Sequence, residues 1–369
     1  MFSIHHHPDA VWVGLDVHKD TISVAVLRPG HDVPTIDKIF HDEASIRRLI
    51  GRLGDRRLLR VCYEAGPTGY ELHRLLASMG VCCEVIAPSL IPTAPGDRVK
   101  TDKRDCRRLA RLHRAGELVA IRVPTPVEEA VRDLCRARGD LVADRRRARQ
   151  RLGSFLLRHG RVYRAGKAWT HAHARWLATQ TFDEPALAAT FDHCRAVLAA
   201  REAAVDAITN DLAGWYDRAP FAETVRRLGA YRGVTHLGGL ILAAEVCDWR
   251  RFARAGVFMG FVGLVPSEYS SGNSTHRGPL TKAGNEHVRV QLVESAWAYQ
   301  YRPAVGVTLA RRQQDASPAT VARSWAAQLR LHRRFATLIA RHKPPSVAAA
   351  AIARELAGFI WAEMTADAA

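Results

Sequence analysis

The stretch VWVGLDVHKDTISVAVL, residues 11–27, decides the fold of the N-terminal part of this 369-residue chain. Two runs rich in β-branched residues flank the turn-forming residues HKD, and this pattern predicts a β-hairpin. The stretch VPTIDKIF (33–40) extends the hairpin into a three-stranded meander. Further along, helical and strand patterns alternate, with helices expected over 43–53, 66–80 and 101–116 and strands over 56–65 and 81–88.

The order of these elements is three strands, helix, strand, helix, strand, helix. An antiparallel meander that continues into two strand–helix units is the topology of ribonuclease H. We therefore expect an α/β domain with a mixed sheet over residues 1–123.

Four carboxylates stand at informative places in this domain. Asp16 interrupts an apolar strand, where a lone carboxylate is costly. Glu64 ends the strand expected to lie beside it, so the two side chains are expected to meet at one sheet edge. Asp102 and Asp105 are three residues apart at the start of a helix and therefore share a face. Each also has a plain structural interpretation. Asp16 could be a turn residue and Glu64 could pair with an arginine, while Asp102 and Asp105 could be an N-cap and a first-turn acid.

Together the four carboxylates form a set of hard oxygen ligands without a histidine or cysteine. Such a set suits Mg²⁺ or Mn²⁺ better than Zn²⁺. Two such ions neutralise a phosphodiester and stabilise the entering and leaving oxygens of an in-line displacement. The acidic set therefore predicts chemistry on a nucleic-acid backbone.

The overall charge points the same way. The chain has 54 Lys and Arg residues against 37 Asp and Glu, a formal net charge of +17. This balance indicates a polyanionic partner, although the codon bias of a GC-rich genome also raises the arginine content. Seven cysteines without CxxC spacing indicate a reduced, cytoplasmic protein. No signal peptide or apolar run of about 18 residues is found, so no membrane association is expected.

Strand patterns stop near residue 124, and residues 124–220 are expected to form long helices. Phe191, Leu198, Val205 and Leu212 recur every seven residues. This spacing predicts an antiparallel or intersubunit coiled coil; ordinary bundle helices within one subunit explain it equally well.

Residues 221–369 are expected to form a helical domain that is richer in glycine. RGVTHLGGLILAAEV (232–246) resembles the turn and second helix of a helix-hairpin-helix module, whose backbone amides bind phosphates, and a plain helical corner is the alternative. EYSSGNSTHRGPLTKAGN (268–285) has the composition of a flexible polar loop.

Five motifs in this order carry a family resemblance: GLDVHKDTISVAV, YEAGPTGYEL, VKTDKRDCRRLARL, GFVGLVPSEYSSG and LTKAGNEHVRVQLVESAWAY. They resemble insertion-sequence transposases with a DEDD, RuvC-like domain, the family that includes the Piv-type DNA invertases and the bridge-RNA-guided recombinases. The resemblance implies that the four carboxylates are a DEDD tetrad that binds divalent metal, namely Asp16, Glu64, Asp102 and Asp105.

The resemblance also implies a serine nucleophile in the C-terminal domain. Ser271 fits best because it directly precedes Gly272, and Ser270 is the next candidate. The implied activity is attack of this serine on DNA phosphodiesters, a covalent phosphoserine intermediate and strand exchange. The nearby basic residues Arg277, Lys282 and Arg289 are candidates for holding the DNA backbone.

The resemblance further implies an element-encoded guide RNA that pairs with the DNA, a homo-oligomer (dimer or tetramer), and a location at the bacterial nucleoid. Two rival functions stay open. The four carboxylates could activate water in a structure-selective DNA nuclease, or the protein could be an inactive DNA-binding regulator. Transposition and Piv-type inversion at a fixed locus are also not distinguished by the sequence.

Overall fold

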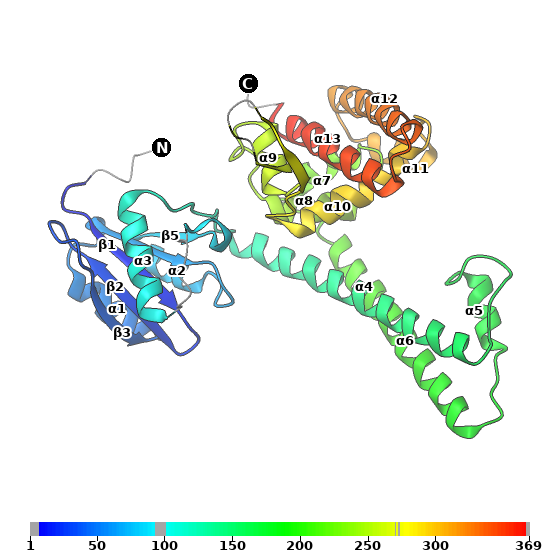
Figure 1. Cartoon of the computed structure of the whole chain (residues 1–369), viewed down its shortest axis with the longest axis horizontal. Coiled ribbons are helices and arrows are strands. Elements are labelled where there is room, and N and C mark those ends of the chain that lie inside the picture. Colours follow the sequence, from blue (N-terminus) through cyan, green and yellow to red (C-terminus); the bar gives the residue numbers. More distant parts are fainter. Residues whose placement is uncertain (1–6, 93–100, 270, 272–273, 367–369) are drawn as a thin grey trace. The chain divides into compact units, whose positions relative to one another are not determined.

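The computed structural model describes residues 7–92, 101–269, 271 and 274–366. The chain divides into two compact units, Met1–Val123 and Pro124–Ala369 (Figure 1). The expected middle region 124–220 and C-terminal region 221–369 therefore fall within one unit. Among the described residues, no helix combines the length and the apolar character needed to cross a membrane.

The N-terminal unit contains a five-stranded sheet with the strand order β3-β2-β1-β4-β5. β1 pairs antiparallel with β2, which pairs antiparallel with β3, whereas β1 and β4, and β4 and β5, are parallel. This confirms the predicted mixed sheet and the predicted order of elements. Their bounds are β1 Val11–Val17, β2 Thr21–Leu27, β3 Thr35–Phe40, α1 Glu43–Leu53, β4 Leu59–Glu64, α2 Glu71–Ser78, β5 Cys82–Ile86 and α3 Asp102–Ala115.

Helices cover both faces of this sheet. Successive strand residues point to opposite faces. Val13 and Leu15 of β1 therefore pack in the core with α1 and α2, whereas Trp12 packs with Cys106 of α3. Asp16 has the same parity as Trp12, so it belongs to the face that α3 covers.

The second unit begins with a pair of long helices. α4 (Pro126–Arg158) and α6 (Pro185–Ala213) run antiparallel, and the short α5 (His171–Ala178), which follows α4 in the chain, lies beside the far end of the pair (Figure 1). Arg149 of α4 contacts Glu202 of α6 at 2.6 Å. The seven-residue repeat predicted from sequence is the buried side of α6. Of the interpretations left open, the structure supports antiparallel packing within the chain.

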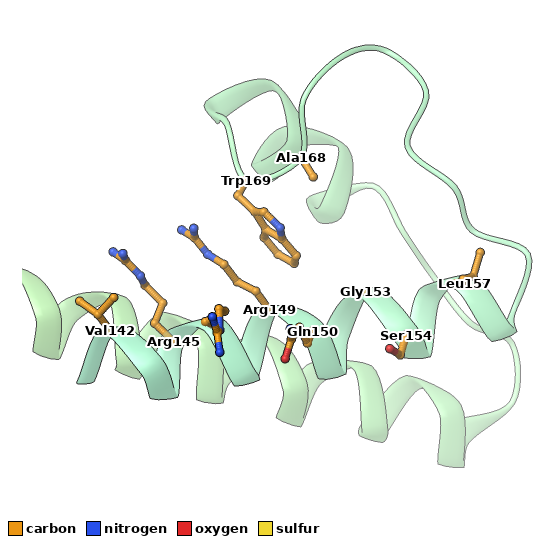
Figure 2. Close-up of a pocket in the computed structure, with 10 residues that line it drawn as sticks. Val142, Arg145, Arg149, Gln150, Gly153, Ser154, Leu157, Ala168 and Trp169 are labelled. Carbon is orange, nitrogen blue, oxygen red and sulfur yellow. The ribbon is translucent and has the colours of Figure 1, made fainter. Parts of the chain in front are cut away.

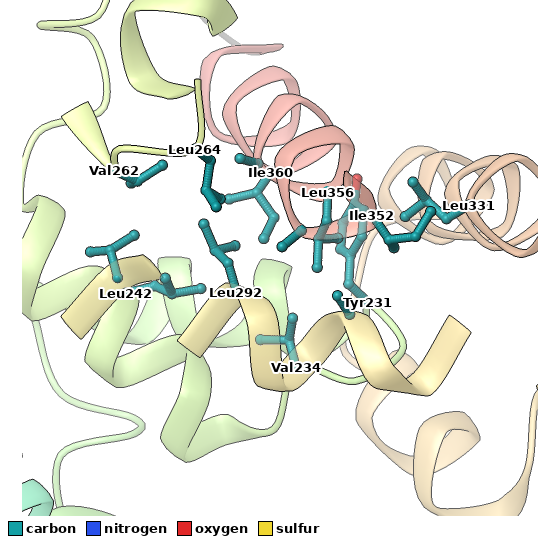
Figure 3. Close-up of a cluster of buried hydrophobic side chains, with 14 of the residues drawn as sticks. Tyr231, Val234, Leu242, Val262, Leu264, Leu292, Leu331, Ile352, Leu356 and Ile360 are labelled. Atoms are coloured by element: carbon teal, nitrogen blue, oxygen red, sulfur yellow. The ribbon is translucent and has the colours of Figure 1, made fainter. Parts of the chain in front are cut away.

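The rest of this unit is a helical bundle around one large apolar core. Leu242, Leu292, Ile352 and Leu356 come from three different helices and meet in this core (Figure 3). The elements are α7 Ala222–Gly229, α8 His236–Val246, α9 Ala255–Phe261, β6 Pro266–Glu268, β7 Arg277–Leu280, α10 Glu286–Ala296, α11 Val307–Gln313, α12 Pro318–Ala340 and α13 Pro345–Thr365; 3-10 turns lie at Arg56–Leu58, Pro88–Leu90 and Trp297–Gln300.

The C-terminal region is mostly helical, as expected, but two short strands lie where a flexible polar loop was expected. β6 and β7 pair antiparallel on either side of the serine-rich segment. The strands are only three and four residues long, so they leave no alternating pattern for sequence analysis to detect. The expected turn before α8 is present: Thr235 caps the helix by accepting a hydrogen bond from the backbone NH of Gly238 at 3.1 Å.

Candidate active site

The candidate site of the N-terminal unit is built at the carboxyl ends of two neighbouring parallel strands. Leu15 of β1 is paired with Tyr63 of β4, which puts Asp16 next to Glu64 in register. The two carboxylates also line the same open cavity, of about 650 Å³, together with His18. The predicted convergence of Asp16 and Glu64 at one sheet edge is therefore what the structure has.

Helix α3 brings the other two carboxylates to this edge. Thr101 is its N-cap, so Asp102 is its first residue rather than its cap, and Asp105 follows one turn later. α3 lies unusually close to β1, because Gly14 has no side chain: a Cβ there would lie 2.4 Å from the carbonyl oxygen of Cys106 and 2.5 Å from the backbone nitrogen of Ala110. This close approach sets the position of Asp102 and Asp105 relative to Asp16.

His18 is a member of the site that sequence analysis missed. Its Nε2 lies 3.3 Å from Oδ2 of Asp16 and 3.5 Å from Oδ1 of Asp102. A short turn with a backbone hydrogen bond from His18 to Thr21 directs it there. The sequence signal for His18 is its position two residues after Asp16, which places the two residues at the same strand end. The HKD stretch on its own indicates only a turn.

Lys38 of β3 was missed as well. Its Nζ lies 3.8 Å from Oδ2 of Asp102. No local pattern points to it, because β3 reaches the site only through the pairing of three strands. Asp105 contacts Arg108, one turn later in α3, at 3.6 Å.

The electrostatics of Asp16 reflect a crowded acidic site. Burial raises the pKa of its carboxyl above the usual range, His18 lowers it, and Asp102 and Asp105 raise it again. Ligand atoms of Asp16, His18 and Asp102 lie within 4.8 Å of one another. A divalent cation would relieve the repulsion among these carboxylates, so the residues present fit such an ion.

Ser271 lies in the second unit, at the turn between β6 and β7. Its backbone NH and carbonyl pair with the carbonyl and NH of Ser274, both at 3.1 Å, and its side chain is exposed. Arg277 lies 3.6 Å from Glu268 across the two strands. Ser270 lies outside the described residues.

The base of this hairpin is held by two close backbone crossings. A Cβ at Gly263 would lie 2.1 Å from the carbonyl oxygen of Ala283, and a Cβ at Gly284 would lie 2.1 Å from that of Phe261. Both glycines also have positive φ angles, which side chains disfavour. Between them Lys282 has a φ of 52° and an exposed side chain. The positions flanking the hairpin are therefore tightly specified.

Two polar side chains tie this base to its surroundings. Arg289 donates from Nη1 to the carbonyl oxygen of Val262 at 3.0 Å. Asn285, the N-cap of α10, donates from Nδ2 to Glu245 at 2.8 Å, and Glu245 also accepts two hydrogen bonds from Arg136 of α4. Of the three basic residues predicted to hold DNA, Arg289 is thus bonded to the hairpin base, Arg277 is exposed and pairs with Glu268, and Lys282 is exposed.

Comparisons with known proteins cover both candidate regions. The transposase model DEDD_Tnp_IS110 matches residues 13–160, which contain all four carboxylates. A second model, described as transposase IS116/IS110/IS902 family, matches residues 225–305, which contain Ser271.

Individual relatives match along most of the chain. The y4qE protein of Sinorhizobium fredii is 43% identical over 95% of this chain and 87% of its own. The transposase for insertion sequence element IS1533 of Leptospira borgpetersenii is 33% identical over 90% of this chain and 98% of its own. The transposase for insertion sequence element IS1111A of Coxiella burnetii is 22% identical, over 78% of this chain and 77% of its own. The chain therefore belongs to the IS116/IS110/IS902 family of insertion-sequence transposases.

Proposed function

We propose that this protein cleaves and rejoins DNA at the ends and target of its insertion sequence, using a serine nucleophile assisted by divalent metal. The observation that carries the proposal is the crowding of carboxylates at one sheet edge. Nε2 of His18 lies 3.3 Å from Asp16 and 3.5 Å from Asp102. The pKa of Asp16 is raised, mainly by burial, and Asp16 lines the same cavity as Glu64. Carboxylates that lie close together repel one another, so their clustering in a chain of net charge +17 indicates a cation-binding site.

The proposed metal ligands are Asp16, Glu64, Asp102 and Asp105, and the hard oxygen set favours Mg²⁺ or Mn²⁺. When bound, such an ion supplies positive charge to a phosphodiester and to the oxygens that enter and leave. The chain's own contribution is to fix these ligands on two strands and one helix.

Ser271 is the proposed nucleophile. Its Oγ forms a bond to phosphorus while the bond from phosphorus to one DNA oxygen breaks; the serine proton passes to a carboxylate or to water, and the released DNA oxygen takes up a proton. The phosphodiester is conserved as a phosphoserine linkage, so a DNA hydroxyl can reverse the step without ATP. The exposure of Ser271 at a hairpin turn supports this role.

Arg277, Lys282 and Arg289 are proposed to hold the flanking DNA backbone. Exposure of the first two supports direct phosphate contact, and the bond from Arg289 to Val262 supports a role for Arg289 in holding the hairpin base. We also propose that an element-encoded guide RNA pairs with the DNA and that the protein works at the nucleoid as a dimer or tetramer. The high net charge suits a protein that holds several nucleic-acid strands.

The rival activity is a metal-dependent nuclease. Its support is that all four carboxylates belong to the N-terminal unit, so water rather than Ser271 could serve as the nucleophile there. Piv-type inversion uses the same proposed chemistry at a fixed locus and differs only in the DNA product.

The deciding experiment traps the full-length protein on DNA that carries the element ends, with Mg²⁺ and RNA transcribed from the element. We expect a DNA-linked peptide that contains Ser271, absent in Ser271→Ala and in Asp16→Asn. Ser274→Ala is the matched control, because Ser274 is the exposed partner of Ser271 in the same turn. Cleaved DNA without an adduct, unchanged in Ser271→Ala, would establish the nuclease instead, and an adduct on Ser270 would move the nucleophile by one residue.

A further inference from the structure

The α4–α6 helix pair carries an open groove that neither the acidic site nor the serine hairpin uses. The groove has a volume of about 670 Å³ and lies along α4, beneath the segment that precedes α5 (Figure 2). We propose that this groove binds an unpaired nucleic-acid strand, with phosphates on the arginines of α4 and a base against Trp169.

The first argument is charge. Residues 142–170 include nine Arg and Lys residues and a single acid, Asp144. Arg145 and Arg146 line the groove and have no ion-pair partner among the described residues. Arg145 is half-buried in this state, so it lacks both full hydration and a counter-charge. A bound anionic ligand supplies the counter-charge that Arg145 lacks.

The second argument is that one arginine is held in place. Arg149 is bonded to Glu202 of α6 and has its guanidinium 5.3 Å from the centre of the Trp169 ring. In Figure 2 the side chains of Arg145 and Arg149, one helical turn apart, extend from α4 in the same direction. The groove therefore presents guanidinium groups in a row, and Arg149 loses little conformational freedom when a phosphate binds.

The third argument is the apolar part of the groove. Leu157 is 66% exposed at its edge, and the indole of Trp169 lies over Gly153, where an added Cβ would lie 4.0 Å from Cζ2 of the ring. His173 packs edge-on against Trp169, with ring centres 4.9 Å apart, and holds the indole in place. Bases of unpaired strands stack on fixed aromatic rings of this kind.

These features together favour an unpaired strand over the alternatives. A duplex presents phosphates but keeps its bases paired, so it leaves the indole and Leu157 in water. An acidic peptide would satisfy the arginines but brings no planar ring for Trp169. The combination of arginines with a fixed indole matches single-stranded DNA or RNA, and the sugar can be distinguished by experiment.

The test measures binding by the full-length protein without divalent metal, so that it is independent of cleavage and of Ser271. The probes are fluorescein-labelled 12-nucleotide dT and rU strands and a 12-base-pair duplex, followed by anisotropy over a salt series. In Arg145→Gln/Arg146→Gln, single-strand affinity is expected to fall about 10-fold and the salt slope by about 1.4, which corresponds to two lost phosphate contacts. The stronger of the dT and rU arms identifies the sugar.

Two further variants make the result specific to the groove. Arg151→Gln/Arg158→Gln removes the same charge from α4 outside the groove lining and should lower affinity no more than about 3-fold. Gly153→Leu keeps every charge but fills the floor, and should lower single-strand affinity about 10-fold while circular dichroism stays unchanged.

A photocrosslink locates the base directly. A strand that contains 5-iodouracil should give, on irradiation, an adduct on the peptide with Trp169, and Trp169→Leu should abolish it. The proposal is overturned if groove variants and the outside control lose equal affinity, if only the duplex is affected, or if the adducts map elsewhere.

Discussion

At the scale of single residues, the missing side chain of Gly14 determines where the carboxylates of α3 lie. The backbone of α3 occupies the space that a Cβ would need. A larger residue at position 14 must push the helix away from β1, and Asp102 and Asp105 move with it.

Gly14→Ala is therefore expected to weaken both folding and metal binding. The clash is with backbone atoms that cannot rotate away, so we expect a loss of about 1–3 kcal/mol in the free energy of unfolding. Urea unfolding and Mn²⁺ titration by calorimetry measure the two effects. Gly51→Ala is the control, because a Cβ there meets nothing within 4 Å. Equal behaviour of the two variants would show that the close approach is unimportant.

His18 gives the second prediction at this scale. Since its Nε2 lies between Asp16 and Asp102, we expect it to bind the metal or to orient the carboxylates that do. His18→Ala should lower Mn²⁺ affinity about 10-fold. Electron spin echo modulation of bound Mn²⁺ separates the roles: a nitrogen signal lost in His18→Ala identifies a direct ligand. Unchanged affinity would limit His18 to a surface ion pair.

At the scale of elements, a buried carboxylate fastens α13 to α7 and α12. Glu363 is fully buried and bonds to Arg227, Arg323, Thr320 and Tyr231. Burial alone would raise its pKa, but the hydrogen bonds from Arg323, Thr320 and Arg227 lower it to about 2 from its ordinary 4.5. The ionised form is thus the one that the folded state stabilises.

This network predicts a loss of stability in acid. The unfolded chain takes up a proton on Glu363 at a higher pH than the folded chain. The contribution of ionised Glu363 to the free energy of unfolding, on the order of 3 kcal/mol, is therefore complete above pH 4.5 and is lost as the pH falls towards 2. Urea unfolding of the wild type and of Glu363→Gln should therefore give a stability difference that is larger at pH 5 than at pH 3. A difference that is constant with pH would contradict the assignment.

At the scale of the whole molecule, the carboxylates and Ser271 belong to different compact units. We expect the active site to be composite and to form between subunits of the proposed oligomer. Asp16→Asn and Ser271→Ala, each inactive alone, should then regain part of the strand exchange when mixed and co-assembled. In a dimer of the two variants, one of the two shared sites combines intact carboxylates with an intact Ser271, and the other contains both substitutions. About half the wild-type activity per dimer is therefore the upper limit. Failure to complement, with mixed oligomers demonstrated by differently tagged subunits, would indicate that each subunit forms its own site.

The sequence by itself determined the order of the elements, the mixed sheet and the meeting of Asp16 with Glu64. These depend on local periodicity and on strand parity, which are properties of neighbouring residues. The seven-residue repeat of α6 likewise showed its buried face. The roles of the four carboxylates and of Ser271 stay predictions.

Only the tertiary structure decided the rest. His18 and Lys38 join Asp102 through a turn and a third strand, and Trp169 meets Arg149 across a loop. Glu363 bonds to partners that are between 40 and 136 residues away in the chain. The strands of the serine hairpin are too short to show in the sequence. Such contacts depend on which distant segments pack together, and local propensity does not encode that choice.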